Sequence, residues 1–323
     1  MTIPILLFIV GLIFLIKGGD WFVDGATGVA KKFHIPDILI GATVVSIGTT
    51  LPEVMVSATS AFSGHGEIAY GNAIGSIICN TALIAAITIT FRPTEIERSS
   101  LKLPVIIFFV AAALYSLIAY CFGAFTRWAG LGLFSVFVTY MVLSVRKAMN
   151  APKPIEELST NEVESNKDFI KNILLLIIGA AVIAFGADLL VDNGTIIAKK
   201  MGVPESVIAL TFIAIGTSLP ELVTAITALV KGHGALSLGN VIGANIFNLV
   251  LVSGISAIVS PFAVPNNTQI AGINSSLLID IPVMLFVMAF LTLPALKKGK
   301  LSRAQGVVLL VVYAAFCTLQ FII

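Results

Sequence analysis

Long apolar stretches dominate this sequence and leave few folds open to it. Inside a bilayer only helices and closed barrels satisfy all of their backbone hydrogen bonds, and a helix of about 20 residues crosses the hydrocarbon core. Ten stretches of that kind run near 3–28, 36–62, 68–90, 102–121, 127–146, 169–197, 204–230, 236–260, 273–293 and 303–322. The sequence therefore predicts an all-α integral membrane protein with ten transmembrane helices.

The composition excludes several classes of protein. Hydrophobic residues make up 58% of the chain and charged residues 11%, against about 25% charged residues in soluble domains. The formal net charge of +2 gives no basic surface for a nucleic acid. Cys79, Cys121 and Cys317 lie in apolar segments without metal-ligand spacing, which argues against a disulfide framework or a zinc site. The sequence contains no Ser/His/Asp set and no HExxH motif, so we expect a protein that is not an enzyme.

The two halves of the chain repeat each other. Residues 44–80, VVSIGTTLPEVMVSATSAFSGHGEIAYGNAIGSIICN, align without gaps to residues 212–248, FIAIGTSLPELVTAITALVKGHGALSLGNVIGANIFN, at an offset of 168 residues. A duplicated unit of five helices explains this pattern. We expect a first repeat at 1–146, a cytoplasmic linker at 147–168 and a second repeat at 169–323. Because five is an odd number of spans, the second repeat is expected to be inverted in the membrane.

Positive charge predicts the orientation, because cytoplasmic loops retain Lys and Arg. Fifteen such residues follow the odd-numbered spans: Lys31, Lys32, Arg92, Arg98, Lys102, Arg146, Lys147, Lys153, Lys167, Lys171, Lys231, Lys297, Lys298, Lys300 and Arg303. The opposite side holds three: Arg127, Lys199 and Lys200. The sequence therefore predicts a multi-pass protein of the cell (inner) membrane with both termini outside.

Each repeat places a glutamate deep inside an apolar span. Glu53 ends the motif GTTLPE and Glu221 ends GTSLPE. A charged residue at the centre of a membrane helix costs roughly 2.5 to 3.5 kcal/mol on insertion scales, so it needs a partner. The proline before each glutamate lacks an N–H and frees the carbonyl of Gly48 or Gly216. A bound cation is the natural partner for these oxygens.

Further oxygen donors share helix faces with the glutamates. Hydroxyls lie three and four residues before each glutamate, and polar residues follow one face of the next span at multiples of four. These donors are Thr49, Thr50, Thr217, Ser218, Asn72, Ser76, Asn80, Asn240 and Asn248. Six to eight oxygens suit Ca2+, and Na+ accepts the same donors, whereas zinc and copper prefer imidazole or thiolate. The pattern predicts a site for a hard cation.

The motifs GTTLPE with GNAIGSIICN, and GTSLPE with GNVIGANIFN, resemble those of the sodium/calcium exchangers, within the cation/calcium antiporter superfamily. The resemblance covers nearly the whole chain and is strongest to the ten-span prokaryotic type. It implies that Glu53 and Glu221 bind both Ca2+ and Na+, and that spans 1 and 6 slide across the other eight. It also implies oxygen donors at Thr49, Thr217, Thr50, Ser218, Ser76, Asn80 and Asn248, with backbone carbonyls from Ser46 and Ala214.

Two positions depart from the family pattern and leave the coupling ion open. Ala244 lacks a hydroxyl that would help to hold Na+, and Asn248 stands where some relatives carry aspartate. The predicted function is exchange of Ca2+ for Na+ by alternating access. The alternatives are an antiporter coupled to protons or K+ and, less in keeping with an inverted repeat, an ion channel. The expected partners are these ions and the lipid bilayer, without a cofactor or an obligatory protein partner.

Other acidic residues lie within or near the spans. Asp280 stands inside the ninth stretch just before Pro282, and an intramembrane acid is a functional candidate. Asp20 and Asp24 lie near the end of the first stretch. Their position favours a role in anchoring the helix over ion binding.

Overall fold

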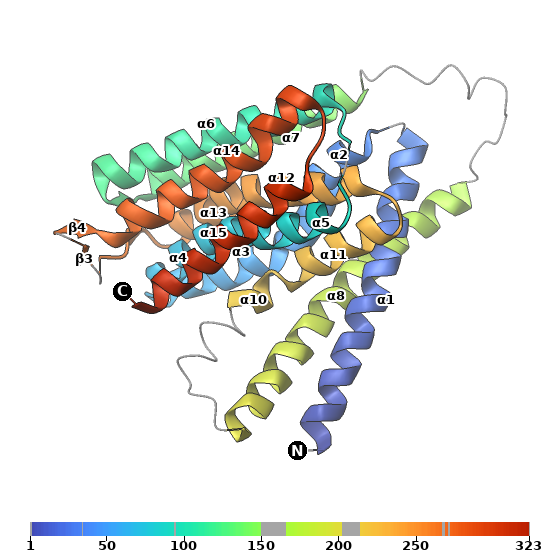
Figure 1. The fold of residues 1–323 in the computed structure, drawn as a ribbon, viewed down its shortest axis with the longest axis horizontal. Helices are drawn as coiled ribbons and strands as arrows, with labels where there is room; N and C mark the ends of the chain where they lie inside the picture. Colours follow the sequence, from blue (N-terminus) through green and yellow to red (C-terminus); the bar gives the residue numbers. More distant parts are fainter. Residues whose placement is uncertain are drawn as a thin grey trace. The chain divides into compact units, whose positions relative to one another are not determined.

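The computed structural model describes residues 2–33, 35–93, 95–149, 166–201, 214–266, 269–270 and 272–322, almost all of them in helices (Figure 1). The α-helices are α1 Thr2–Phe33, α2 Asp37–Ile40, α3 Ser46–Phe62, α4 Gly66–Cys79, α5 Ala86–Phe91, α6 Arg98–Phe122, α7 Arg127–Met149, α8 Asn166–Lys200, α10 Ala214–Thr217, α11 Leu219–Val230, α12 Gly234–Phe247, α13 Ser253–Val259, α14 Ile281–Lys298 and α15 Arg303–Ile322. The π-helical segments are η1 Gly41–Val45, η2 Asn80–Ala85, η5 Asn248–Val252 and η6 Ser276–Asp280. Short strands are β1 Ala124–Phe125, β2 Phe262–Ala263, β3 Gln269–Ile270 and β4 Ile273–Asn274.

Nine helical stretches within the described ranges are long and apolar enough to cross a membrane. They match nine of the ten predicted spans and confirm the predicted class of all-α integral membrane protein. The remaining predicted span, 204–230, begins outside the described residues and ends in the shorter apolar helix α11. Most of the predicted linker also lies outside them, between the end of α7 at Met149 and the start of α8 at Asn166.

The elements recur at the offset of the sequence repeat. Helices α4 and α12 are each 14 residues long and begin 168 residues apart. Each is followed directly by a π-helical segment, which begins at Asn80 in the first half and at Asn248 in the second. The repeated sequence therefore forms the same local structure twice. Inversion of the second half in the membrane stays a prediction.

The chain divides into two compact units, and each takes segments from both halves of the sequence. Unit 1 comprises Met1–Thr49 and Met141–Asn240. Unit 2 comprises Thr50–Tyr140 and Val241–Ile323.

In unit 1, helices α1 and α8 pack against each other as an antiparallel pair (Figure 1). Glycines on the two helices lie in the contact: Gly11, Gly18, Gly25, Gly179 and Gly186. A Cβ atom at Gly25 would lie 2.5 Å from the carbonyl oxygen of Asn172 and from the amide nitrogen of Leu176. Only glycine allows the two backbones to approach so closely.

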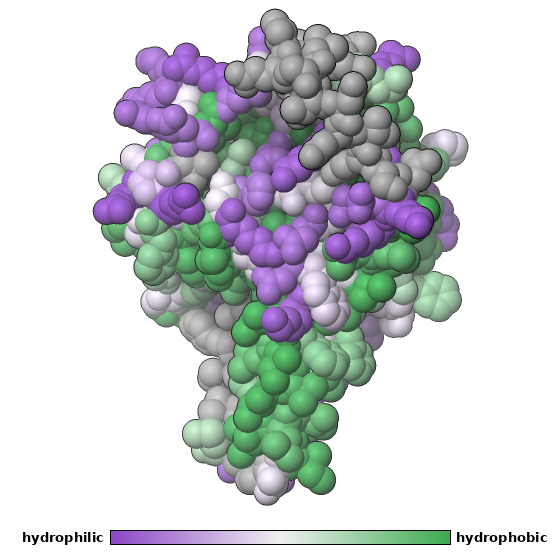
Figure 2. Space-filling view, turned by 90° about the vertical axis from the view of Figure 1, so that its right-hand side faces the viewer, coloured by the Kyte–Doolittle hydropathy of each residue, from purple (hydrophilic) through white to green (hydrophobic). Residues whose placement is uncertain are grey.

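The N-terminal half of α1 carries a hydrophobic outer surface. Ile3, Leu6, Ile9, Ile13 and Ile16 are each more than 40% exposed. Figure 2 shows hydrophobic side chains covering this end of the helix. A hydrophobic outer surface suits contact with the hydrocarbon core of a bilayer.

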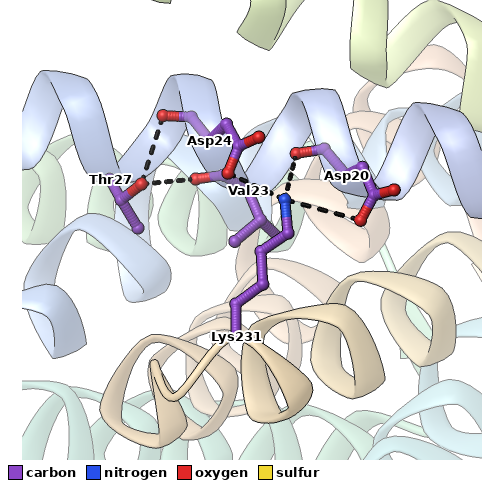
Figure 3. A network of polar contacts seen from close by, with 5 residues as sticks. All are labelled: Asp20, Val23, Asp24, Thr27 and Lys231. Carbon is purple, nitrogen blue, oxygen red and sulfur yellow. Dashed lines mark hydrogen bonds and ion pairs between the residues drawn. The ribbon is translucent and has the colours of Figure 1, made fainter.

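A network of ion pairs joins α1 to the turn after α11 within unit 1 (Figure 3). Lys231 Nζ lies 2.7 Å from Asp24 Oδ1 and 3.4 Å from Asp20 Oδ1, and it donates to the Asp20 backbone oxygen at 3.0 Å. Thr27 Oγ1 donates to the backbone oxygens of Val23 and Asp24. These contacts agree with the expectation that Asp20 and Asp24 anchor the helix.

We expect Lys231→Met to lower the free energy of unfolding by less than about 1 kcal/mol, because exposed ion pairs are screened by water. The Asp24 side chain is 54% exposed and that of Lys231 is 25% exposed. Thermal unfolding of the purified protein in detergent measures the change, with Lys297→Met at the exposed end of α14 as the matched control. A loss of several kcal/mol would show that the network bears much more of the stability than its exposure implies.

Unit 2 is built around α4 and the segments that pack on it. Helix α4 contacts η5, α13 and α14, while α15 packs on α5 and η2. Within the unit β1 pairs with β2, and the Phe125 and Phe262 rings stack with centroids 5.1 Å apart. These contacts bury polar residues of α4 and η2, including Ser76 and Asn80, in the interior of the unit.

Candidate ion-binding site

Both units bury polar side chains in their membrane-spanning helices. Fully or almost fully buried polar residues in unit 1 include Ser46, Thr49, Ser218, Glu221, Thr224 and Asn240. Those in unit 2 include Thr50, Glu53, Ser57, Ser76, Asn80, Thr81, Asn245 and Asn248. Because burial of a polar group without a partner is costly, such groups require hydrogen bonds, water or an ion.

In unit 1, three of these groups form one hydrogen-bond network. Ser46 Oγ donates to the backbone oxygens of Gly41 and Asn240, at 2.8 and 3.0 Å. Thr49 Oγ1 donates to Asn240 Oδ1 at 3.2 Å. The structure therefore joins two predicted ligand residues, Ser46 and Thr49, to Asn240 of the motif GNVIGANIFN.

Glu221 stands at a helix break in unit 1. Helix α10 ends at Thr217, Ser218 adopts a non-helical conformation, and α11 begins at Leu219 with Glu221 in its first turn. The positive end of a helix dipole favours a carboxylate there. A helix end also leaves backbone carbonyls for other partners, which suits the role expected of Ala214 in α10. Glu221 itself is 0% exposed.

Glu53 stands on a continuous helix in unit 2. Helix α3 runs through Pro52 without a break, although its motif differs from that of the second repeat by one residue in six. A proline inside a helix removes one hydrogen bond and bends the helix without having to end it. Asn72 on α4 donates to Ser57 Oγ at 2.9 Å and lies 3.5 Å from the Glu53 backbone oxygen. This contact holds the carboxylate-bearing turn against α4.

Asn80 and Asn248 are candidate ligands because of their buried amide groups. Both carboxamides are 0% exposed. Neither the oxygen nor the nitrogen of either group has a hydrogen-bond partner among the residues that the structure describes. Each asparagine also begins a π-helical segment, and such segments are frequent at functional sites. Buried amides of this kind normally hold water or an ion, and the oxygens suit a hard cation.

The predicted ligands thus fall into two sets, one in each unit. Unit 1 holds Ser46, Thr49, Ala214, Thr217, Ser218 and Glu221, and unit 2 holds Thr50, Glu53, Ser76, Asn80 and Asn248. Asn72 and Asn240, which the helix faces predicted as oxygen donors, also lie in polar networks. The sequence reasoning omitted Thr81 and Asn245, which the structure joins by a hydrogen bond.

Asp280, the intramembrane acid of the ninth predicted span, has a local partner in unit 2. Its Oδ1 accepts a hydrogen bond from Gln320 Nε2 at 2.7 Å. This bond links η6 to the last helix of the chain. It gives the carboxyl group a role in helix packing.

A multi-pass membrane protein with buried carboxylates and carboxamides has the features of a transporter. The family model described as sodium/calcium exchanger protein matches the chain over residues 3–146 and 171–322. The chain therefore belongs to the sodium/calcium exchanger family, a family of transporters. The two matched stretches lie within the two halves marked by the sequence repeat.

Individual relatives span the whole chain or most of it. The sodium/calcium exchanger MaX1 of Methanosarcina acetivorans is 32% identical and covers 100% of both chains. The inner membrane protein YrbG of Escherichia coli is 36% identical over 81% of both. Among solved structures, the sodium-calcium exchanger NCX_Mj soaked with Na+ and Sr2+ matches with a TM-score of 0.84 at 29% identity, covering 97% of each chain.

Proposed function

We propose that this protein is a secondary antiporter that exchanges Ca2+ for Na+ across the membrane. The observation that carries the proposal is the complete burial of Glu53 and Glu221, each inside an apolar helix of a chain from the exchanger family. Two carboxylates nearly neutralise one divalent cation. Na+ competes for the same oxygens, so the two ions exchange if the empty site does not reorient.

The proposed roles follow the chemistry of each group. Glu53 and Glu221 supply charge to both ions, and Thr49 and Thr217 supply hydroxyl and backbone oxygens. Ser46 and Ala214 offer backbone carbonyls. The remaining lining donors are Thr50, Ser76, Ser218, Asn80 and Asn248. Support for the last two comes from their buried amide groups, which lack partners among the described residues.

Alternating access is the proposed mechanism, with both termini outside and the 147–168 linker in the cytoplasm. The excess of Lys and Arg on the linker side supports this orientation. The name of the inner membrane relative supports the cell membrane as the location. The close contact between α1 and α8 supports their movement as one body during transport.

Uptake of radioactive Ca2+ into proteoliposomes tests the coupling ion. Vesicles are loaded with Na+, K+ or choline, and a further set carries an acidic interior to supply a proton gradient. We expect rapid uptake only with internal Na+, because its outward gradient then drives Ca2+ inward. Uptake into the three other sets should stay at the level of protein-free liposomes.

The outcomes separate the candidate functions. Uptake driven by internal K+ or by the proton gradient would identify K+ or H+, and not Na+, as the coupling ion. Buried Ala244, which brings no hydroxyl to α12, is the feature that favours this second candidate. Equally fast uptake under all four conditions would indicate a channel and refute exchange.

A further inference from the structure

Three side chains in unit 2 form a buried triad that the proposed ion site does not include. Asn245 on α12, Thr81 in η2 and Met288 on α14 are each 0% exposed. Asn245 Nδ2 donates to Thr81 Oγ1 at 2.7 Å and to Met288 Sδ at 3.1 Å. Thr81 Oγ1 donates in turn to Met288 Sδ at 3.2 Å. The triad therefore joins three membrane-spanning segments through polar contacts.

The sulfur fixes the orientation of the carboxamide. A thioether has no proton and accepts hydrogen bonds only, so the amide atom that faces Met288 is the nitrogen. The oxygen of Asn245 is then turned away from these two partners. It is buried and has no hydrogen-bond partner among the described residues. It thus joins the four amide atoms of Asn80 and Asn248 as a buried polar atom that water or an ion must satisfy.

The triad lies directly beside the two asparagines in sequence. Thr81 follows Asn80, and Asn245 precedes Asn248 by three residues. Asn80 and Asn248 each begin a π-helical segment, where the regular ladder of helical hydrogen bonds changes. The bond from Asn245 to Thr81 therefore connects the starts of η2 and η5. Displacing either residue displaces the neighbouring asparagine.

The sequence repeat does not reproduce the two polar residues of the triad. At the repeat offset of 168 residues, Leu249 stands in place of Thr81 and Ile77 in place of Asn245. Neither side chain forms hydrogen bonds. The same repeat also replaces the hydroxyl of Ser76 by Ala244, the residue just before Asn245. The two halves therefore differ where polar groups border Asn80 and Asn248.

We propose that Asn245 and Thr81 are positioning residues that set the choice between monovalent and divalent cations by holding the Asn80 and Asn248 carboxamides in place. This inference rests on the proposed function, in which those two groups line the ion site. Ca2+ binding depends chiefly on the charge of two carboxylates. A monovalent ion gains less from that charge and depends more on well-placed neutral oxygens.

The test compares two ion affinities in purified, reconstituted protein. Asn245→Leu and Thr81→Val each remove the bond between the two residues, and Thr81→Ser retains the hydroxyl as the matched control. We expect the first two to raise the half-saturating concentration of the coupling cation about fivefold, the size expected for one hydrogen bond. The half-saturating Ca2+ concentration should change less than about twofold, and Thr81→Ser should match the wild type.

Thr81→Val and Asn245→Leu combined give a second readout. If both act through one bond, the double variant should also show about a fivefold change, whereas independent effects would multiply to about 25-fold. Equal shifts for both ions, or unchanged affinity for the coupling cation in variants with wild-type thermal stability, would overturn the inference. Wild-type uptake tests the proposed function separately, and the comparison uses whichever cation drives that uptake.

Discussion

Glu53→Gln and Glu221→Gln are each expected to abolish Ca2+ transport and to weaken Ca2+ binding by at least about 100-fold. Removing one partner of a buried charge pair costs about 3 kcal/mol or more, and 1.4 kcal/mol corresponds to tenfold in affinity. Both glutamates are 0% exposed. Water therefore cannot readily stabilise a bound Ca2+ in place of the lost carboxylate. Binding of radioactive Ca2+ to the purified protein and uptake into proteoliposomes measure the two effects.

Glu67→Gln is the matched control for these variants. Glu67 lies in the first turn of α4 and is exposed, so the same change in charge should leave binding and uptake near wild type. Glutamine has nearly the shape of glutamate and keeps one oxygen, which limits the structural disturbance. Near-normal Ca2+ affinity in either buried variant would remove that glutamate from the proposed site.

Gly25→Val and Gly179→Val are expected to destabilise unit 1 by about 3 kcal/mol each, at the upper end of the usual range for overpacking. A Cβ atom at Gly179 would lie 2.5 Å from the amide nitrogen of Phe22 and 2.8 Å from its Cα atom. Backbone atoms cannot move aside as a flexible side chain can, so α1 and α8 must separate. Thermal unfolding in detergent and the monodisperse fraction on size exclusion measure the loss.

Gly132→Val on α7 is the control for the glycine variants. A Cβ atom there would meet nothing within 4 Å among the described residues. The substitution should therefore leave the unfolding temperature close to that of the wild type. Wild-type stability in Gly25→Val and Gly179→Val would contradict the tight packing of the helix pair.

The membrane-spanning helices could be predicted from the sequence because their cause is local. A run of about 20 apolar residues is stable in a bilayer as a helix whatever its neighbours are. The gapless repeat likewise accounts for the equal length of α4 and α12 and for their starts 168 residues apart. The burial of Glu53 and Glu221 followed from their place inside such runs.

Nearly identical motifs nevertheless took different backbone conformations. GTTLPE lies within the continuous helix α3, whereas GTSLPE is divided at Ser218 between α10 and α11. The equivalent asparagines of the two repeats, Asn72 and Asn240, also differ in their hydrogen bonds. Asn72 donates to Ser57, but Asn240 accepts from Ser46 and Thr49. Local propensity is almost the same in each pair, so contacts with the rest of the unit decide the outcome.

The sequence by itself determined the membrane class, the repeat and the residue types of the proposed oxygen-rich cation site, since each depends on hydrophobic length or on spacing along one helix. Only the tertiary structure decided which polar groups become partners. Thr81 meets Asn245 across 164 residues of sequence, and Lys231 meets Asp24 across 207. Such pairs depend on how separate helices pack, and no periodicity within a single helix specifies them.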